Sequence, residues 1–368
     1  MADQRLTSIE VEGFTSIRST RLELGAMNVL IGANGAGKSN FIQAVGMLSR
    51  IVGGELNFFV GLNGGSSALL NNTSGWPRIH LELDAYPHTY EATLVPAAGN
   101  ELIFELEAVS FISTEGGSRR EVLGRGHQET KLNSHEAAVR ITELLNGCKV
   151  FHFHDTSLNA PPKRQVSVAD NISLRADAGN LAAVLLGLQT SRSRADRAAY
   201  RRIVGAIKLV APFFRDFVLH PASGTDHVQL RWLEKNGDAV FSANQLSDGT
   251  LRFVCLATLL LQPALPTLVV LDEPELGLHP FAIVQLADML RQASARSQVL
   301  IATQSVTLMN QFEVEDLVIV ERAAGASVFT RPDPERLKNW LDEYSLGELW
   351  EKNLIGGQPG STGSVLDD

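Results

Sequence analysis

Residues 32–39 have the composition of a loop that binds phosphate groups. They read GANGAGKS and match the pattern G-x-x-x-x-G-K-[ST]. The glycines let the backbone curl so that its N–H groups point at phosphate oxygens, Lys38 suits the β- and γ-phosphates of a nucleotide, and Ser39 suits Mg²⁺. A chance glycine-rich turn is the alternative. The apolar run 27–31 before the loop and a helix expected over about 38–51 supply the context that the motif requires.

The loop predicts ATP and Mg²⁺ as ligands, and a pair of acids completes this prediction. The apolar run 267–271 ends in Asp272 and Glu273. An Asp at the end of such a strand is a typical Mg²⁺ ligand beside the loop serine, while the adjacent Glu is a candidate to polarise the water that attacks the γ-phosphate. Solvated acids at a strand end are the alternative. Nucleotide contacts are expected from Gly32, Asn34, Gly35, Ala36, Gly37, Lys38, Ser39 and Asn40, and metal contacts from Ser39 and Asp272.

Further motifs give the chain a family resemblance. LSDGT at 246–250 resembles the signature motif of ABC-type ATPases, and DEPELGLHP at 272–280 resembles their Walker B segment and D-loop. With IEVEGFTSIRS at 9–19, the set is similar to the RecF/SMC/OLD branch, and more narrowly to ATPases of the AAA-15/21 type. The resemblance implies ATP hydrolysis and an ATP-dependent homodimer, in which Ser247 and Gly249 of one subunit contact the nucleotide of the other. Ser247 as an ordinary helix cap is the alternative, and both can hold.

The chain departs from this family at two places. Gln304 occupies the position of the switch histidine, and because an amide can hydrogen-bond a phosphate but cannot take a proton, turnover is expected to be slow or to depend more on Glu273. No glutamine marks the Q-loop, where the segment FHFHD at 151–155 falls. For His152, His154 and Asp155 three interpretations remain: a polar strand end, a nucleotide-sensing segment, or an independent metal site.

The order of patterns along the chain predicts an α/β fold, a P-loop NTPase with an ABC-type ATPase head. Strands expected at 267–271, 298–302 and 316–320 alternate with helices, which favours a parallel sheet. Alternating residues at 79–83 and 102–106 predict antiparallel strands, helical periods follow over 178–218, and glycine-rich stretches at 53–65 and 71–77 are expected to be loops. We expect an ATPase core from 1–53 and 241–355, an inserted β and helical lobe at 54–240, and a disordered tail at 356–368.

The overall composition excludes several classes of protein. The 368 residues, 44% of them apolar, suffice for one large or two ordinary domains. A net charge of −9 excludes a protein held on nucleic acid by bulk charge, although not a local basic patch. Two cysteines, Cys148 and Cys255, exclude a disulfide scaffold. No signal pattern and no apolar run of about 20 residues is present, so a cytoplasmic protein without a membrane segment is expected.

The middle of the chain carries a basic cluster that bears on partners. It consists of Arg192, Arg194, Arg197, Arg201 and Arg202. On a helix, three of these share one face, where they could contact DNA phosphates, but a solvated face beside acidic neighbours is the preferred interpretation. Arg119, Arg120 and Arg125 lie in a glycine-rich stretch and are a weaker indication of contacts with DNA. Two functions remain open: an ATPase acting on DNA in repair or phage defence, or a slow ATP-dependent switch controlling a separately encoded nuclease or toxin. Neither a nuclease domain nor a long coiled coil is expected.

Overall fold

Short apolar runs that are far apart in the sequence pair into one sheet around the phosphate loop. The computed structural model describes residues 5–71, 77–112, 117–221 and 224–357. The strand order is β17-β16-β3-β15-β14-β8. The strands are β3 (Met27–Ile31), β8 (Cys148–Phe151), β14 (Leu268–Asp272), β15 (Gln298–Thr303), β16 (Leu317–Ala323) and β17 (Ala326–Thr330). β3 is parallel to both β15 and β16, and every residue of β3 and β15 is buried, as expected for a sheet covered on both faces. The predicted parallel sheet is confirmed, with strand ends within about three residues of those expected.

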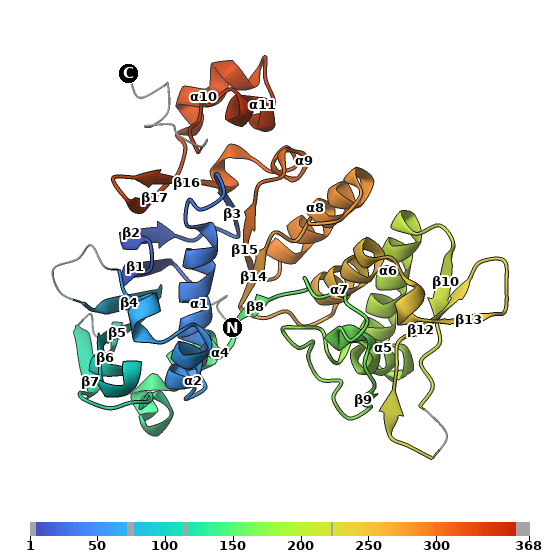
Figure 1. The fold of residues 1–368 in the computed structure, drawn as a ribbon, viewed down its shortest axis with the longest axis horizontal. Coiled ribbons are helices and arrows are strands. Elements are labelled where there is room, and N and C mark those ends of the chain that lie inside the picture. The colour runs from blue at the N-terminus through green and yellow to red at the C-terminus, as the bar shows by residue number, and fades with distance from the viewer. Residues whose placement is uncertain (1–4, 72–76, 113–116, 222–223, 358–368) are drawn as a thin grey trace. The chain divides into compact units, whose positions relative to one another are not determined.

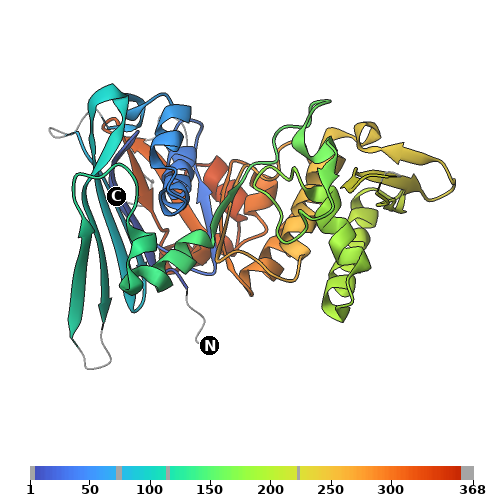
Figure 2. The same ribbon diagram turned by 90° about the horizontal axis from the view of Figure 1, so that it is seen from below.

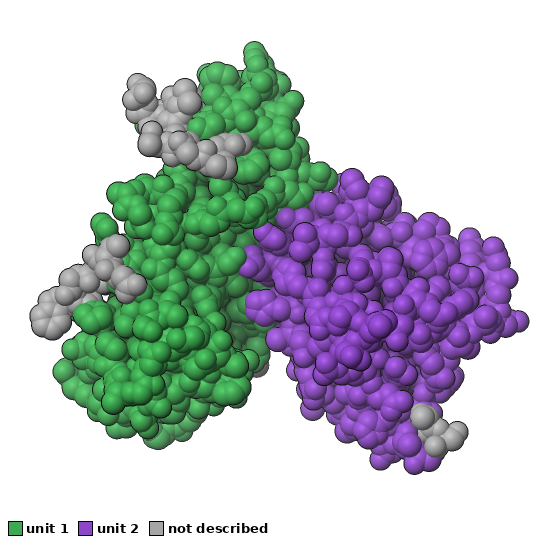
Figure 3. All heavy atoms as spheres, in the orientation of Figure 1, with its two compact units in different colours: residues 1–150, 266–270, 298–368 green, residues 151–265, 271–297 purple. Residues whose placement is uncertain are grey.

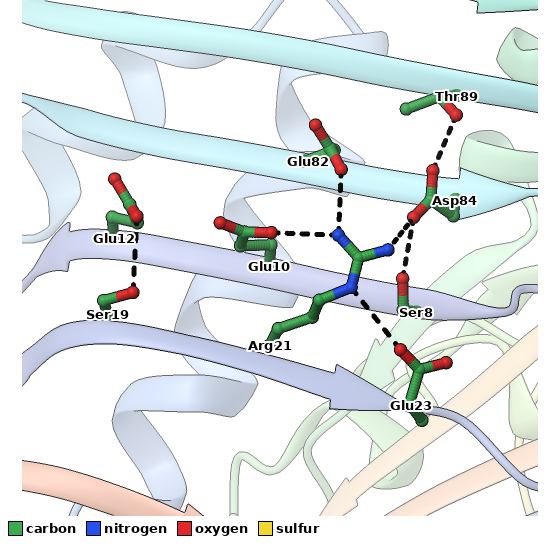
Figure 4. Close-up of polar contacts among 9 residues, drawn as sticks. All are labelled: Ser8, Glu10, Glu12, Ser19, Arg21, Glu23, Glu82, Asp84 and Thr89. Carbon is green, nitrogen blue, oxygen red and sulfur yellow. Dashed lines mark hydrogen bonds and ion pairs between the residues drawn. The ribbon is translucent and has the colours of Figure 1, made fainter.

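A second sheet is wholly antiparallel and has one wet face. Its order is β2-β1-β4-β5-β6-β7. The strands are β1 (Ser8–Phe14), β2 (Ile17–Glu23), β4 (Ile79–Ala85), β5 (His88–Pro96), β6 (Leu102–Ile112) and β7 (Ser118–Gly124). Alternate residues such as Ile9 and Leu81 are fully buried, and α1 (Lys38–Val52) packs beside β1 (Figures 1 and 2). On the other face Arg21 forms ion pairs with Glu10, Glu82 and Asp84 (Figure 4).

The chain divides into two compact units, coloured in Figure 3. Unit 1 comprises residues 1–150, 266–270 and 298–368, and unit 2 comprises residues 151–265 and 271–297. The boundaries of these two units differ from those expected from the sequence, which were a core of 1–53 and 241–355 and an insertion at 54–240. Residues 79–124 join the strand pair β1–β2 through the β1–β4 ladder, so they belong with the phosphate loop, whereas the helical part forms unit 2.

Unit 2 is mainly helical. Its long helices are α5 (Leu181–Thr190), α6 (Arg194–Val210), α7 (Asp248–Leu261) and α8 (Pro280–Ser294). α7 is buried from Leu251 to Leu261, with α6 and α8 in contact with it. Two small sheets, β10-β12-β13 and β9-β11, complete the unit; their strands are β9 (Val166–Ser167), β10 (Phe214–Phe217), β11 (His227–Val228), β12 (Arg231–Glu234) and β13 (Val240–Ser242).

One expected loop is a helix. Residues 56–62 form α2 (Leu56–Leu62), followed by α3 (Ser66–Leu69), although the glycines around them predicted loops throughout. The cause lies elsewhere in the chain, because the Glu129 carboxylate accepts the N–H groups of Leu56 and Asn57 and so caps the helix. The second expected loop falls mostly on residues 72–76, outside the described residues.

The remaining helices of unit 1 are α4 (Val139–Asn146), α9 (Val306–Met309), α10 (Pro334–Leu341) and α11 (Leu346–Glu351). No helix in the described ranges combines the length and apolar character needed to span a membrane.

Candidate functional site

The phosphate loop connects buried β3 to the first turn of α1. Lys38 is only 4% exposed, and its Nζ donates to the carbonyl oxygens of Gly32 (2.6 Å) and Ala33 (3.0 Å). The lysine therefore closes the loop upon itself, while Asn34, Gly35 and Ser39 face solvent. Gly37 has φ +118°, and a Cβ there would lie 2.0 Å from Ser327 Oγ. Only glycine fits this position, because both its φ and its surroundings exclude a side chain.

Two serines that the sequence analysis did not single out support the loop from β17 and from the β1–β2 turn. Ser327 Oγ donates to the carbonyl oxygen of Ala36 at 2.5 Å and lies 2.6 Å from Ser16 Oγ. Asn40 Nδ2 donates to Ser16 Oγ at 2.6 Å. Asn40, predicted to contact nucleotide, thus has a bond that braces the first turn of α1. The only sequence signal for this support is Ser16, which lies within the IEVEGFTSIRS motif.

The chain beyond α11 returns to the base of the same loop. The N–H of Ala33 donates to the carbonyl oxygen of Gly357 at 2.8 Å, and the N–H of Gly357 donates to Glu321 Oε1 at 2.6 Å. Gly357 has φ +84°, and a Cβ there would lie 3.0 Å from Trp350 Nε1. Gly357, the second residue of the segment expected to be a disordered tail, is therefore bonded to the loop; residues 358–368 lie outside the described part.

Gln304 reaches the phosphate loop from the end of β15. Its Nε2 donates to Asn34 Oδ1 at 2.6 Å, and both residues belong to unit 1. The structure thus brings two of the predicted site residues together at the exposed side of the loop. A side-chain amide in this place can hydrogen-bond a phosphate oxygen or a water, but it has no proton-accepting role at neutral pH.

The predicted acids lie at the end of β14, in unit 2. Asp272 Oδ1 is buried, and no hydrogen-bond partner for it occurs within the described residues. A buried carboxylate oxygen without a partner costs free energy unless something binds it, so its chemistry fits a Mg²⁺ ion or a water of its shell. Glu273 has φ +42°, a left-handed conformation that is unfavourable for a residue with a side chain. Such strain is concentrated at functional positions.

The LSDGT segment forms the N-terminus of α7. Ser247 is the N-cap, and its Oγ accepts the N–H of Thr250 at 3.2 Å. The capping alternative is therefore observed, and Ser247 is also exposed. A Cβ at Gly249 would lie 2.5 Å from the carbonyl oxygen of Gly277, so glycine is needed where the LSDGT and DEPELGLHP segments meet.

Arg252 ties α7 to the FHFHD segment. Its Nε donates to the carbonyl oxygen of Phe153 at 3.0 Å and its Nη2 to that of His154 at 3.2 Å. Burial lowers the pKa of Arg252. Phe153, His154 and Arg252 line one small pocket with Asp272 and Glu273, all in unit 2. Arg252 was not predicted as a site residue, and its position five residues after Ser247 was the available signal.

The two histidines of the FHFHD segment do not assemble a metal cluster. Their ring centroids are 6.5 Å apart, and burial, followed by the charge of His154, lowers the pKa of His152. The Asp155 carboxylate instead interacts with Ser157, whose N–H it accepts at 3.0 Å; the hydrogen bond from the Ser157 hydroxyl, followed by the one from its N–H, lowers the pKa of Asp155. Across the residues that the structure describes, no group of three or more His, Cys, Asp or Glu side chains could hold a metal ion. The independent metal site gains no support.

Comparison with known proteins agrees with the fold and with the family resemblance. The family model described as "AAA domain, putative AbiEii toxin, Type IV TA system" matches residues 27–310. An Smc head bound to the C-winged helix domain of ScpA is similar in structure, with a TM-score of 0.56 and 15% identity over 91% of this chain and 99% of that one. An Smc head from Pyrococcus furiosus, with an extended coiled coil and bound to the C-terminal domain of ScpA, is also similar. Its TM-score is 0.54 and its sequence identity 14%, over 92% of this chain and 99% of that one. No curated protein matches in sequence. At these identities the structures establish the fold, and the family model spans most of the chain. The protein therefore belongs to this AAA domain family and has the fold of an SMC-head-like, ABC-type P-loop ATPase.

Proposed function

We propose that the protein binds ATP with Mg²⁺ at residues 32–39 and hydrolyses it. The observation that carries the proposal is the phosphate loop itself, with Lys38 buried beneath it and Gly37 fixed against Ser327. The curled backbone of the loop and the start of α1 form a site for anions of the size and charge of a triphosphate. The family assignment supports the same chemistry.

The roles of the side chains follow from their types and surroundings. Lys38 would neutralise the β- and γ-phosphates, and Ser39 and Asp272 would hold Mg²⁺, which would offset the charge that develops on the phosphates. Asp272 suits this role because its buried Oδ1 has no hydrogen-bond partner within the described residues. Glu273 accepts a proton from the attacking water, and Gln304 orients a water or a phosphate oxygen from its place beside Asn34.

ATP is further proposed to join two copies of the chain. Ser247 and Gly249 begin the 14-residue helix α7, a suitable terminus for a phosphate, and Ser247 is exposed. Because one subunit's own phosphate loop already holds its nucleotide, the natural target of Ser247 is the γ-phosphate bound by a second subunit. The biological setting of such a dimer is proposed to be DNA repair or phage defence.

A slow switch that controls a partner protein is the second candidate function. Gln304 favours it, because an amide at the switch position cannot assist proton transfer and so lowers turnover. The two similar Smc heads are bound to domains of ScpA, which makes a protein partner a reasonable proposal here. A turnover rate indifferent to DNA, combined with ATP-dependent capture of a partner, distinguishes this function from the first.

The experiment measures turnover and mass on three proteins. Glu273→Gln should retain ATP but lose turnover by ~10²-fold or more, as expected for loss of a general base. With ATP it should form a dimer in light scattering, because hydrolysis no longer releases the nucleotide. Adding Ser247→Arg should abolish that dimer while the monomer still binds ATP. Turnover within a few-fold of wild type would remove Glu273 from the mechanism, and a dimer that survives Ser247→Arg would refute the shared site.

A further inference from the structure

α6 separates its apolar and its basic residues onto opposite sides. Ala199, Tyr200, Ile203, Val204 and Ile207 are buried in unit 2, where α6 contacts α5, α7 and α8. The exposed side carries Arg194, Arg197, Arg201 and Lys208, which we name the arginine face. At 100° per residue these four lie within an arc of about 60°, and at 1.5 Å per residue they span about 21 Å. Arg202 is exposed on the flank of the face.

The arginine face forms no ion pair with the described residues of unit 2. The ion pairs of unit 2 include Arg175 with Asp170, Arg215 with Asp238 and Arg291 with Asp288, and no side chain of the arginine face forms one within the described residues. The face therefore has no direct ion-pair partner among the described residues, and the acids bonded near α6, Asp196 and Asp216, interact with Ser191 and Tyr200 instead.

The few polar contacts near the face do not change this. Arg197 donates one hydrogen bond, to the carbonyl oxygen of Ser191 at 2.7 Å. The carboxylate of Asp196, the acidic residue of α6, instead accepts a hydrogen bond from the Ser191 hydroxyl, with an Oγ–Oδ2 distance of 2.6 Å. Burial, followed by the charge of Arg202, lowers the pKa of Arg296.

We propose that the arginine face binds the phosphate backbone of double-stranded nucleic acid. Exposed guanidinium groups form forked hydrogen bonds with phosphate oxygens, and 21 Å of helix follows roughly six base pairs at 3.4 Å each. The face bears no aromatic side chain, so it lacks the stacking surface that single strands require.

A membrane surface fits less well than a duplex. A helix that lies on a membrane inserts its apolar side, and that side of α6 is buried in the protein. The protein as a whole carries a charge of −9, so binding at this face depends on a local positive potential and should be strongly sensitive to salt. The proposal is independent of the ATPase assignment, and its test needs no nucleotide.

The test measures binding of a fluorescein-labelled 30-base-pair duplex by anisotropy at 50 to 200 mM KCl. The variant replaces Arg194, Arg197 and Arg201 by Gln. Losing three phosphate contacts should reduce the slope of log K against log[KCl] by about 2.7 and weaken binding at 100 mM by on the order of 10²-fold. Replacing the same three residues by Lys keeps the charges and should retain most of the slope. The matched control replaces Arg119, Arg125 and Arg140 of unit 1 by Gln; these exposed residues give the same change in net charge.

Each outcome decides the proposal. A large loss in the α6 variant with at most a few-fold loss in the control supports it, provided that both variants unfold at the wild-type temperature. Equal losses in the two variants would show that net charge matters and the face does not. Absence of duplex binding by the wild type at 50 mM KCl would overturn the proposal. Tighter binding to a single-stranded 30-mer or to vesicles of anionic phospholipid than to the duplex would overturn it as well.

Discussion

Replacing Arg252 by Met should destabilise unit 2 and slow turnover together. The change keeps the apolar stem and the helix propensity of α7 but removes the hydrogen bonds to the carbonyl oxygens of Phe153 and His154. Bonds from a charged donor contribute about 1.5–3 kcal/mol each, hence roughly 3–6 kcal/mol for the two. Part of this is offset, because burial already opposes the charge of Arg252 and lowers its pKa. We expect a net loss of about 2–3 kcal/mol, or roughly 5–10 °C in the melting temperature of the unit.

Thermal unfolding followed by circular dichroism measures the first effect, and steady-state ATP turnover at 20 °C measures the second. Arg201→Met is the matched control, the same substitution at an exposed helix position, and should change stability by less than about 0.5 kcal/mol. The melting temperature of Arg252→Lys should lie between those of Arg252→Met and wild type. Because Arg252 lines the pocket with Asp272 and Glu273, we expect kcat to fall more than KM rises. An Arg252→Met protein as stable as the control would refute the inference that these two bonds hold the FHFHD segment on α7.

Two further predictions concern the phosphate loop. Lys38→Ala should weaken ATP binding by about 10²-fold, the equivalent of one or two charge-assisted hydrogen bonds, and calorimetry on a protein with wild-type circular dichroism checks it; unchanged affinity would contradict the nucleotide assignment. Gly37→Ala should also lose ATP, because its Cβ would lie 2.0 Å from Ser327 Oγ. Adding Ser327→Gly should recover only part of the affinity, since φ +118° stays unfavourable for alanine; full recovery would show that the backbone strain is unimportant.

The phosphate loop and the parallel strands were predictable because their signals are local. The motif of Gly32 to Ser39 lies within eight consecutive residues. The mainly apolar β3 before it leaves few alternatives to a buried strand. Asp272 and Glu273 were found in the same way, as acids at the end of an apolar run.

The contacts that complete these elements could not be predicted, because they connect distant residues. Ser327 supports Ala36 across 291 positions, and Arg252 reaches Phe153 across 99. Glu129 stabilises the start of α2 from 73 residues away, so glycine content alone gave the wrong prediction for residues 56–62. Nor does a helical period show whether acids face Arg194 and Arg201, since that depends on which elements pack beside α6.

The strand order also determines when the nucleotide site can form during synthesis. β3 pairs with β15 and β16, so that Val29 lies opposite Ile301 on one side and Leu317 on the other. A ribosome that has made β3 must add about 270 further residues before its first neighbour in this sheet emerges, which at 5–20 residues per second takes on the order of tens of seconds. Throughout that interval the five residues of β3, four of them apolar, lack the neighbouring strands that later cover them, and ATP cannot stabilise the nascent chain. Nearly the whole chain must therefore be made before nucleotide can contribute to folding, and a nascent chain paused before β15 depends on chaperones for its solubility.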